Sequence, residues 1–213
     1  AWAASTAAMI QVGFMRRHCS AVRDGAHGPL CDAGHAAVCQ NETSMDLPAY
    51  LRIQAHANAL SNQRLGRALQ ALDADAWAAP RTSFFPSLAR TLDHILAVDH
   101  YYVGALHGDA RLREAYAAFQ PCTGADEWMQ RQRASDLRLV AFCERLDAAS
   151  VDAWVGMPRA DHVQRDRAGH VLAHLFNHQT HHRGHVHAML AGTAAAPPQL
   201  DEFMMPSEAH LRT

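Results

Sequence analysis

Apolar residues recur at spacings of three and four from Met45 to Leu190, with few interruptions. This is the period of helices that bury one face, and no convincing series of strands accompanies it. The one exception is a short strand that we expect near Trp154. Helices of this length predict an all-α fold, a four-helix bundle with a shared interior. They are expected at about residues 47–72, 83–106, 126–146 and 167–190.

Capping and breaking residues mark the ends of these helices. Asp46 is available to cap the first helix, and Pro48 is tolerated in its first turn. Gly108 closes the second helix. Pro197 and Pro198 forbid continuation of the fourth. The pattern therefore predicts separate helices with defined ends.

Residues 1–44 lack this periodicity and are broken by glycines and a proline. We therefore expect a poorly ordered, dispensable N-terminal leader there, followed by one domain over residues 45–213. The glycine and proline in the leader argue against a helix that would align its potential zinc ligands, so we expect no zinc site. Those ligands recur at intervals of four: His27, Cys31, His35 and Cys39.

The charge balance excludes one class of partner. The 19 basic residues, all of them arginine, stand against 21 acidic ones, for a formal charge of -2, and they form no cluster. Neutralisation of phosphates by Lys and Arg supplies most of the affinity for nucleic acid. We therefore expect no nucleic-acid partner.

Membrane and export signals are missing from the pattern. No apolar run reaches the roughly 18 residues needed to cross a bilayer, and the best candidate, Ile95–Leu106, contains Asp99 and His100. Arg16 and Arg17 follow the apolar N-terminal residues, which is the wrong order for a secretory signal. The five cysteines suggest no disulfide framework. We expect a cytoplasmic protein with reduced thiols and no membrane partner.

Histidine is the unusual residue of this chain, with 16 in all, eight of them between His162 and His187. Five histidines of the fourth predicted helix fall within an arc of about 100°, the width of a core-facing stripe. Such a stripe should be apolar, because burying imidazoles costs free energy unless each nitrogen is paired. A bound metal ion resolves that conflict. The five are His174, His178, His181, His182 and His185.

Several pairs in this stripe have the spacing of a chelate. Neutral imidazoles at positions i and i+4 lie one turn apart and can bind a divalent ion at about 2.0 to 2.1 Å. Such pairs also arise by chance in a histidine-rich chain, but five histidines on one face favour a metal. Three pairs qualify: His178 with His182, His174 with His178, and His181 with His185.

A third ligand should come from another helix. His94 is the best candidate, because it lies in the middle of the second predicted helix and shares its apolar face. His100 lies on a different face, and His107 adjoins the terminal Gly108. His56 on the first helix is a weaker alternative, for which a surface or hydrogen-bonded structural role is favoured.

Two segments resemble the DinB family of metalloenzymes, within the wider DinB/YfiT-like group: FFPSLARTLDHILAVDHYYVGALHG at 84–108 and HLFNHQTHHRGH at 174–185. The likeness extends through AHANALSNQRL in the first helix and PPQLDEF after the last, and covers about residues 47–203. It implies a four-helix bundle with an unusual connection order, commonly found as a dimer. On this resemblance we expect a homodimer.

The resemblance also implies a metal triad. By motif match it falls on His94, His178 and His182, in agreement with the choice made from spacing. The other histidines of the stripe then orient the ligands or move protons. Three neighbours belong to the same motif and are expected near the site: Asn177, Gln179 and Arg183.

This chain departs from the family at three positions. Family members often carry tryptophan where Leu60 and Tyr102 stand, and glutamine where His185 stands. The wall of the pocket is therefore expected to differ from that of other members, while the triad stays intact.

Three histidines leave a coordination position open, which is the arrangement of catalytic rather than structural zinc. The open position suits a water for hydrolysis or the thiolate of a low-molecular-weight thiol cofactor for group transfer. We expect a metal-dependent hydrolase or thiol-dependent transferase acting on a small-molecule substrate. The nearest candidates for a general base are His174, His181 and Asp99. The ion is expected to be zinc or nickel first, then iron or manganese.

Two alternatives without catalysis stay open at this point. A metal-binding or stress-response module would use the ion only to hold the helices together. A plain scaffold, with every histidine hydrogen-bonded, would bind no metal at all.

Overall fold

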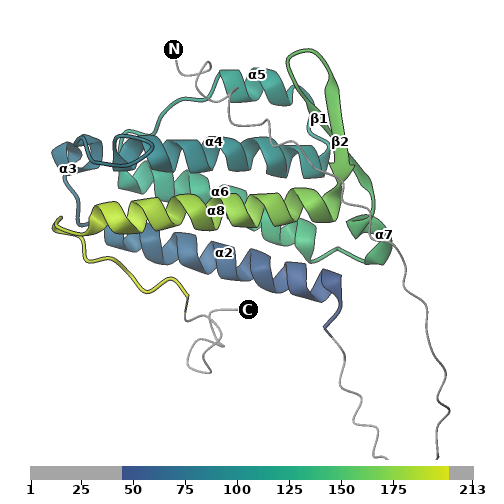
Figure 1. The fold of residues 1–213 in the computed structure, drawn as a ribbon, viewed down its shortest axis with the longest axis horizontal. Coiled ribbons are helices and arrows are strands. Elements are labelled where there is room, and N and C mark those ends of the chain that lie inside the picture. The colour runs from purple at the N-terminus through teal and green to yellow at the C-terminus, as the bar shows by residue number, and fades with distance from the viewer. Residues whose placement is uncertain (1–44, 202–213) are drawn as a thin grey trace, which may run out of the picture. The chain divides into compact units, whose positions relative to one another are not determined.

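The computed structural model describes residues 45–201 of the chain. This part is mostly helical, with one small sheet (Figure 1). Four long helices run alongside one another: α2 and α4 each pack against both α6 and α8. The prediction of a mostly helical fold is confirmed. The long helices are α2 (Leu47–Leu69), α4 (Leu88–His107), α6 (Ala125–Cys143) and α8 (Ala168–Leu190).

Short elements connect the long helices. The strand expected near Trp154 is confirmed as β1, but its antiparallel partner β2 was missed, with Trp154 opposite Arg167. The sequence of β2, VQRDR, carries no alternation of apolar residues, so only its backbone pairing makes it a strand. The short elements are α3 (Ala74–Ala78), α5 (Leu112–Ala117), α7 (Ala148–Val151), β1 (Trp154–Pro158) and β2 (Val163–Arg167).

Caps set the ends of α4, the helix that carries the first predicted ligand. It begins later than the expected Ser83, because the Ser87 side chain accepts a hydrogen bond from the Arg90 backbone N–H at 3.2 Å and caps the helix at that point. Gly108 ends it as expected, with a positive φ of 72° that favours glycine. Residues 83–87 are thereby left as a loop in front of the helix.

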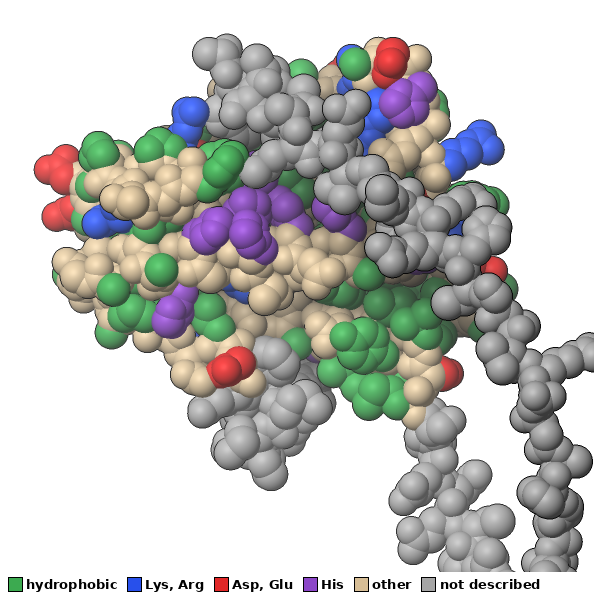
Figure 2. Space-filling view, in the orientation of Figure 1, with side chains coloured by type: hydrophobic (Ala, Val, Ile, Leu, Met, Phe, Trp, Pro, Cys, Tyr) green, Lys and Arg blue, Asp and Glu red, His purple; other side chains and the backbone are tan. Residues whose placement is uncertain are grey.

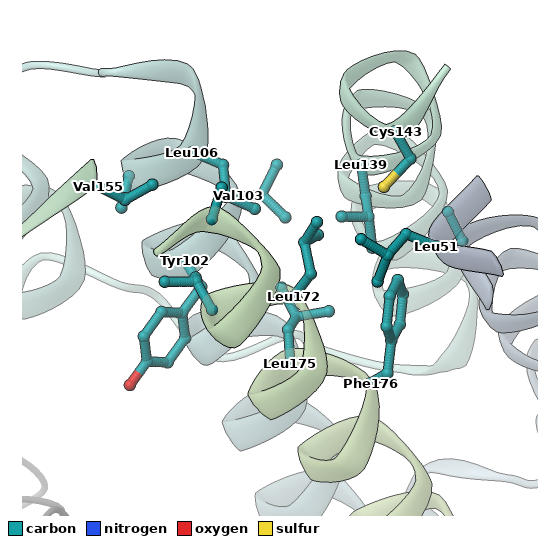
Figure 3. Close-up of a cluster of buried hydrophobic side chains, with 14 of the residues drawn as sticks. Leu51, Tyr102, Val103, Leu106, Leu139, Cys143, Val155, Leu172, Leu175 and Phe176 are labelled. Atoms are coloured by element: carbon teal, nitrogen blue, oxygen red, sulfur yellow. The ribbon is translucent and has the colours of Figure 1, made fainter. Parts of the chain in front are cut away.

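The apolar interior forms two clusters at opposite ends of the long helices. One lies where α4, α6 and α8 meet the start of α2 and the hairpin (Figure 3). The other surrounds the fully buried Trp128, whose indole N–H donates to the Leu92 carbonyl at 3.0 Å. Along every long helix, the buried residues between the two clusters include polar ones. The site is built at this middle level.

Three predictions concern membrane spans, cysteines and the N-terminal leader. Within residues 45–201, no helix is both long and apolar enough for a membrane span. The two cysteines in this part, Cys122 and Cys143, are both buried and unpaired. The predicted disorder of the leader lies outside the described residues. So do its four potential zinc ligands, His27, Cys31, His35 and Cys39.

Candidate metal centre

Three imidazoles from two helices converge at the middle level. His94 comes from α4, and His178 and His182 come from successive turns of α8. One ring nitrogen of each lies within 4.8 Å of the other two. The Nε2 atoms of His94 and His178 are 2.9 Å apart. In a tetrahedral site with bonds of about 2.0–2.1 Å, two ligand nitrogens are roughly 3.3 Å apart, so the donor set fits a divalent ion.

The packing of α4 against α8 fixes this convergence. His178 and His182 are one turn apart, so both face α4, where His94 lies between buried apolar neighbours. Phe85, in the loop before α4, covers the group: its ring centroid is 4.5 Å from that of His94 and 5.7 Å from that of His182. We call His94, His178 and His182 the triad.

Burial keeps the triad neutral. It lowers the pKa of His94 to about 4. Burial, followed by the neighbouring imidazoles His182, His94, His174 and His181, lowers the pKa of His178 to about 2. For His182 the same two causes lower the pKa to about 3. Neutral imidazole is the form that binds metals, so the ligands are ready at neutral pH without losing protons.

The ring nitrogens of the triad are short of protein partners. Nδ1 of His178 and Nδ1 of His182 are buried, and neither makes a hydrogen bond. Buried polar side chains with a structural role are normally paired. In His178 this nitrogen is not the one that faces His94, so the case for an ion rests on the convergence of the three rings.

Two further predicted residues flank the triad. The ring centroid of His174 is 6.1 Å from that of His178, and the ring centroid of His181 is 4.8 Å from that of His182. Both side chains are exposed. Figure 2 shows histidine side chains gathered on this face of the molecule. His185 lies beside His181, and these two form with His182 a second group whose ring nitrogens lie within 4.8 Å of one another.

Asp99 does not lie among the imidazoles. It is almost fully buried, and its Oδ2 accepts hydrogen bonds from the side-chain amides of Gln132, at 2.6 Å, and Gln179. Burial, and then the nearby Asp136, raise the pKa of its carboxyl well above its ordinary value. Its connection to the metal centre runs through Gln179, which follows His178 on α8. The structure thus gives Asp99 the contacts of a positioning residue.

Asp99 is one member of a buried polar cluster that we call the interior network. Arg183 Nη1 donates to the amide oxygens of Asn58, Asn62 and Gln179. Asp136 accepts from Asn62 at 3.0 Å, and also from Asn58 and Gln132. The network takes side chains from all four long helices. Its members are Asn58, Asn62, Asp99, Gln132, Asp136, Gln179 and Arg183.

Only part of this network was predicted from the sequence. Gln179 and Arg183 were expected near the site, but the four members on α2 and α6 were missed. A signal was present, because Asn58 and Asn62, like Gln132 and Asp136, are polar pairs at i and i+4. Each pair interrupts the apolar face of its helix at the same level as the triad.

The histidines set aside as ligands make other contacts. His56 Nε2 is 2.6 Å from a carboxylate oxygen of Glu144, a surface contact between α2 and α6 that confirms its structural role. His100 is exposed and packs against Phe119, with ring centroids 6.1 Å apart. His107 Nε2 lies 3.0 Å from the Arg138 carbonyl oxygen.

Two comparisons with known proteins give the same family. The family model described as "DinB family" matches residues 50–210. The chain is also similar to "Protein DinB" of Bacillus subtilis (strain 168), with 26% identity over 148 residues, which are 66% of this chain and 85% of that protein. Both the triad and the interior network lie within the matched residues.

Proposed function

Because the chain belongs to the DinB family, we propose that it is a metal-dependent enzyme built on a four-helix bundle of the DinB/YfiT-like type. His94, His178 and His182 hold one divalent ion, with zinc or nickel first and iron or manganese next. An ion held by these three imidazoles would keep a coordination position for a nucleophile and would supply the Lewis acidity for its attack on a small electrophilic substrate. That nucleophile is a water, for hydrolysis, or a low-molecular-weight thiol, for transfer.

One observation carries this proposal: three neutral imidazoles converge, and no further His, Cys, Asp or Glu side chain among residues 45–201 lies within 4.8 Å of all three. A closed structural site would have a fourth protein ligand. A divalent ion bound by three imidazoles supplies Lewis acidity to whatever enters the remaining position.

The chain's own residues then have distinct tasks. Phe85 covers His94 and His182 and keeps water from that side of the triad. His174 and His181 flank the triad from the exposed side, where imidazoles can take and return the nucleophile's proton. Asp99 acts through Gln179, because its carboxyl is enclosed in the interior network.

Elemental analysis of the purified protein, with the variants His178→Ala and His170→Ala, tests the metal assignment. We expect one divalent ion per chain in the wild type and roughly a hundredfold or greater loss of affinity in His178→Ala. His170→Ala is the matched control, because His170 is on the same helix but contacts Asp166 at 2.8 Å instead of the triad. Full stoichiometry in His178→Ala would refute the assignment.

Cobalt substitution separates the two nucleophiles. A thiolate charge-transfer band on adding a low-molecular-weight thiol, absent in His182→Ala, would support transfer. Activity on ester or amide panels that needs no thiol and rises with an ionisation near pH 7 would support hydrolysis. An ion without any exchangeable ligand, together with silence in both assays, would replace the enzyme by a structural metal module.

A further inference from the structure

A cavity of about 380 Å³ opens beside the triad. One wall is the loop before α4, and the other is the last part of α8. No acidic side chain lines it. Its apolar lining, including Phe84 and Met189, is combined with a cation, two hydroxyls and an imidazole. The residues used below are Arg81, Thr82, Ser83, Phe84, His185 and Met189.

Arg81 is held in place at the wall of this cavity. Its backbone N–H donates to the Pro86 carbonyl at 2.8 Å, and its Nη2 donates to the Ala76 carbonyl at 3.0 Å. Its Nε is buried and has no hydrogen-bond partner. A guanidinium fixed in this way, with an N–H still unpaired, suits an oxyanion, because two parallel N–H donors match two oxygens.

Other donors surround the same space. The hydroxyls of Thr82 and Ser83 follow Arg81 along the loop. His185 lies opposite on α8, and its Nδ1 is buried without a partner. Arg81 and His185, from two separate elements, therefore line one cavity, and each has a buried nitrogen without a hydrogen-bond partner. Unpaired buried polar groups are rare in folded proteins, and Arg81 Nε–H, which can only donate, indicates a missing acceptor.

Both walls of the cavity lead to the triad. On the α8 side, the ring centroid of His185 is 5.5 Å from that of His182. On the loop side, the ring of Phe84 packs edge-on against Phe85 at 4.9 Å, and Phe85 in turn covers His94. Phe85 closes the loop side, so a molecule in the cavity is separated from the triad only by the imidazole of His185 on the α8 side.

We propose that this cavity binds the oxyanion of a small organic acid, a carboxylate or a phosphate ester, with Arg81 as its counter-ion and the hydroxyls of Thr82 and Ser83 as further donors. The apolar part of the molecule lies along Phe84 and Met189. This inference rests on the proposed function, since the reacting end of the same molecule lies at the triad. It restricts the substrate to amphipathic anions.

Calorimetric titration of the zinc-loaded full chain tests the cavity with defined probes. Butyrate and propyl phosphate distinguish the two oxyanions, and butyramide is the neutral match of butyrate. We expect at least one anion to bind and butyramide not to bind. In Arg81→Gln the dissociation constant of that anion should rise about tenfold or more, the effect of losing hydrogen bonds to a charged group. Arg133→Gln removes an exposed arginine on α6 and should change nothing.

Two additional variants guard against a disturbed loop. Arg81→Lys keeps the charge and should retain more affinity than Arg81→Gln, and Ser83→Ala should weaken binding less than either. Equal anion affinity in wild type and Arg81→Gln, or equal binding of butyramide, would overturn the inference.

A metal-free arm separates this inference from the proposed function. After zinc removal the anion should still bind within a few-fold of its original affinity, because Arg81 is not a metal ligand. Loss of anion binding with the zinc would show that the probe had bound the ion, and would refute the cavity as the anion site. Failure of the wild type to hold zinc would refute the proposed function while leaving Arg81-dependent anion binding measurable.

Discussion

The triad and the interior network lie one residue apart along α8, yet the network is joined by many internal hydrogen bonds and the triad by one contact between imidazole nitrogens. His178 and His182 belong to the triad, whereas Gln179 and Arg183, each the next residue, belong to the network. In the network, Arg183 and the amides hydrogen-bond one another, and two oxygens, Asp99 Oδ1 and Gln132 Oε1, have no partner. In the triad, Nδ1 of His178 and Nδ1 of His182 are buried without a hydrogen-bond partner.

This difference separates structure from function. A polar cluster that pairs internally stabilises the arrangement of helices, and removing one member leaves the others unpaired. A cluster that lacks partners is complete only with something from outside. We therefore expect damage to the network to appear in folding, and damage to the triad to appear in metal binding.

The largest expected effect is in the network. Arg183→Met removes the cation that faces Asp99 and Asp136, and leaves three amide oxygens without a donor. We expect the free energy of unfolding to fall by about 3–5 kcal/mol, as when one partner of a buried charged group is lost. Urea denaturation measures it, with the exposed Arg133→Met as control. A loss of unfolding free energy below about 1 kcal/mol would show that the network does not stabilise the arrangement of helices.

The second effect is stabilisation by metal through the triad alone. Zinc at one hundred times its dissociation constant should raise the unfolding free energy by about 2.7 kcal/mol, because it binds only the folded chain. His182→Ala should show no such gain. Thermal denaturation with and without zinc measures both. An equal gain in His182→Ala would place the ion elsewhere.

The two regions also respond to pH in opposite directions in the metal-free protein. Burial raises the pKa of Asp136 from 3.8 to about 7, so its contribution to stability is full below about pH 4 and is lost as the pH rises through 7. Burial lowers the pKa of His94 from 6.5 to about 4, so its contribution is full above about pH 6.5 and is lost as the pH falls through 4.

Denaturation between pH 4 and 7 separates these two contributions. In Asp136→Asn we expect the loss of stability that Asp136 causes at rising pH to disappear. The slope of the unfolding free energy against pH should change by at most about 1.4 kcal/mol per pH unit. Asp75→Asn, at an exposed carboxyl of α3, is the control. An unchanged slope in Asp136→Asn would show that this carboxyl is ionised throughout the range.

The smallest expected effect is that of His178→Leu in the metal-free protein. The substitution puts an apolar side chain of similar size in place of a neutral imidazole and removes one contact, between its Nε2 and that of His94, so the unfolding free energy should change by less than about 1 kcal/mol. Gln179→Leu, one residue further, should cost more, because Asp99 and Arg183 lose a partner. Comparable losses in both variants would mean that the triad is also structural.

The three ligands of the candidate site could be predicted from the sequence. The three proposed ligands were predicted from spacing and resemblance, and the structure brings them together. The i,i+4 spacing of two of them places both on one face of a helix, whatever the packing of that helix. Which face of α4 meets α8 depends on tertiary packing, but His94 shared a face with apolar residues and so was found.

The misses have a common physical cause, which is that burial depends on neighbours. Leu47 and Leu137 fit the helical pattern, yet they are 52% and 60% exposed. Asn58 and Asp136 are polar, yet they are buried, because side chains from other helices pair with them. Asp99 was assigned to the site from its place near His94, but its partners lie on α6 and α8.

A helix with five histidines along one stripe has more than one way to present a metal site. A turn of α8 about its own axis by roughly 100°, the step from one residue to the next, would bring a different set of imidazoles toward α4. Arg183 and Gln179 oppose such a turn, because it would break their hydrogen bonds to side chains on α2 and α4. We infer that the network selects one rotational setting of α8. X-ray absorption of zinc-loaded Arg183→Met should then show mixed coordination, and a single unaltered environment would contradict it.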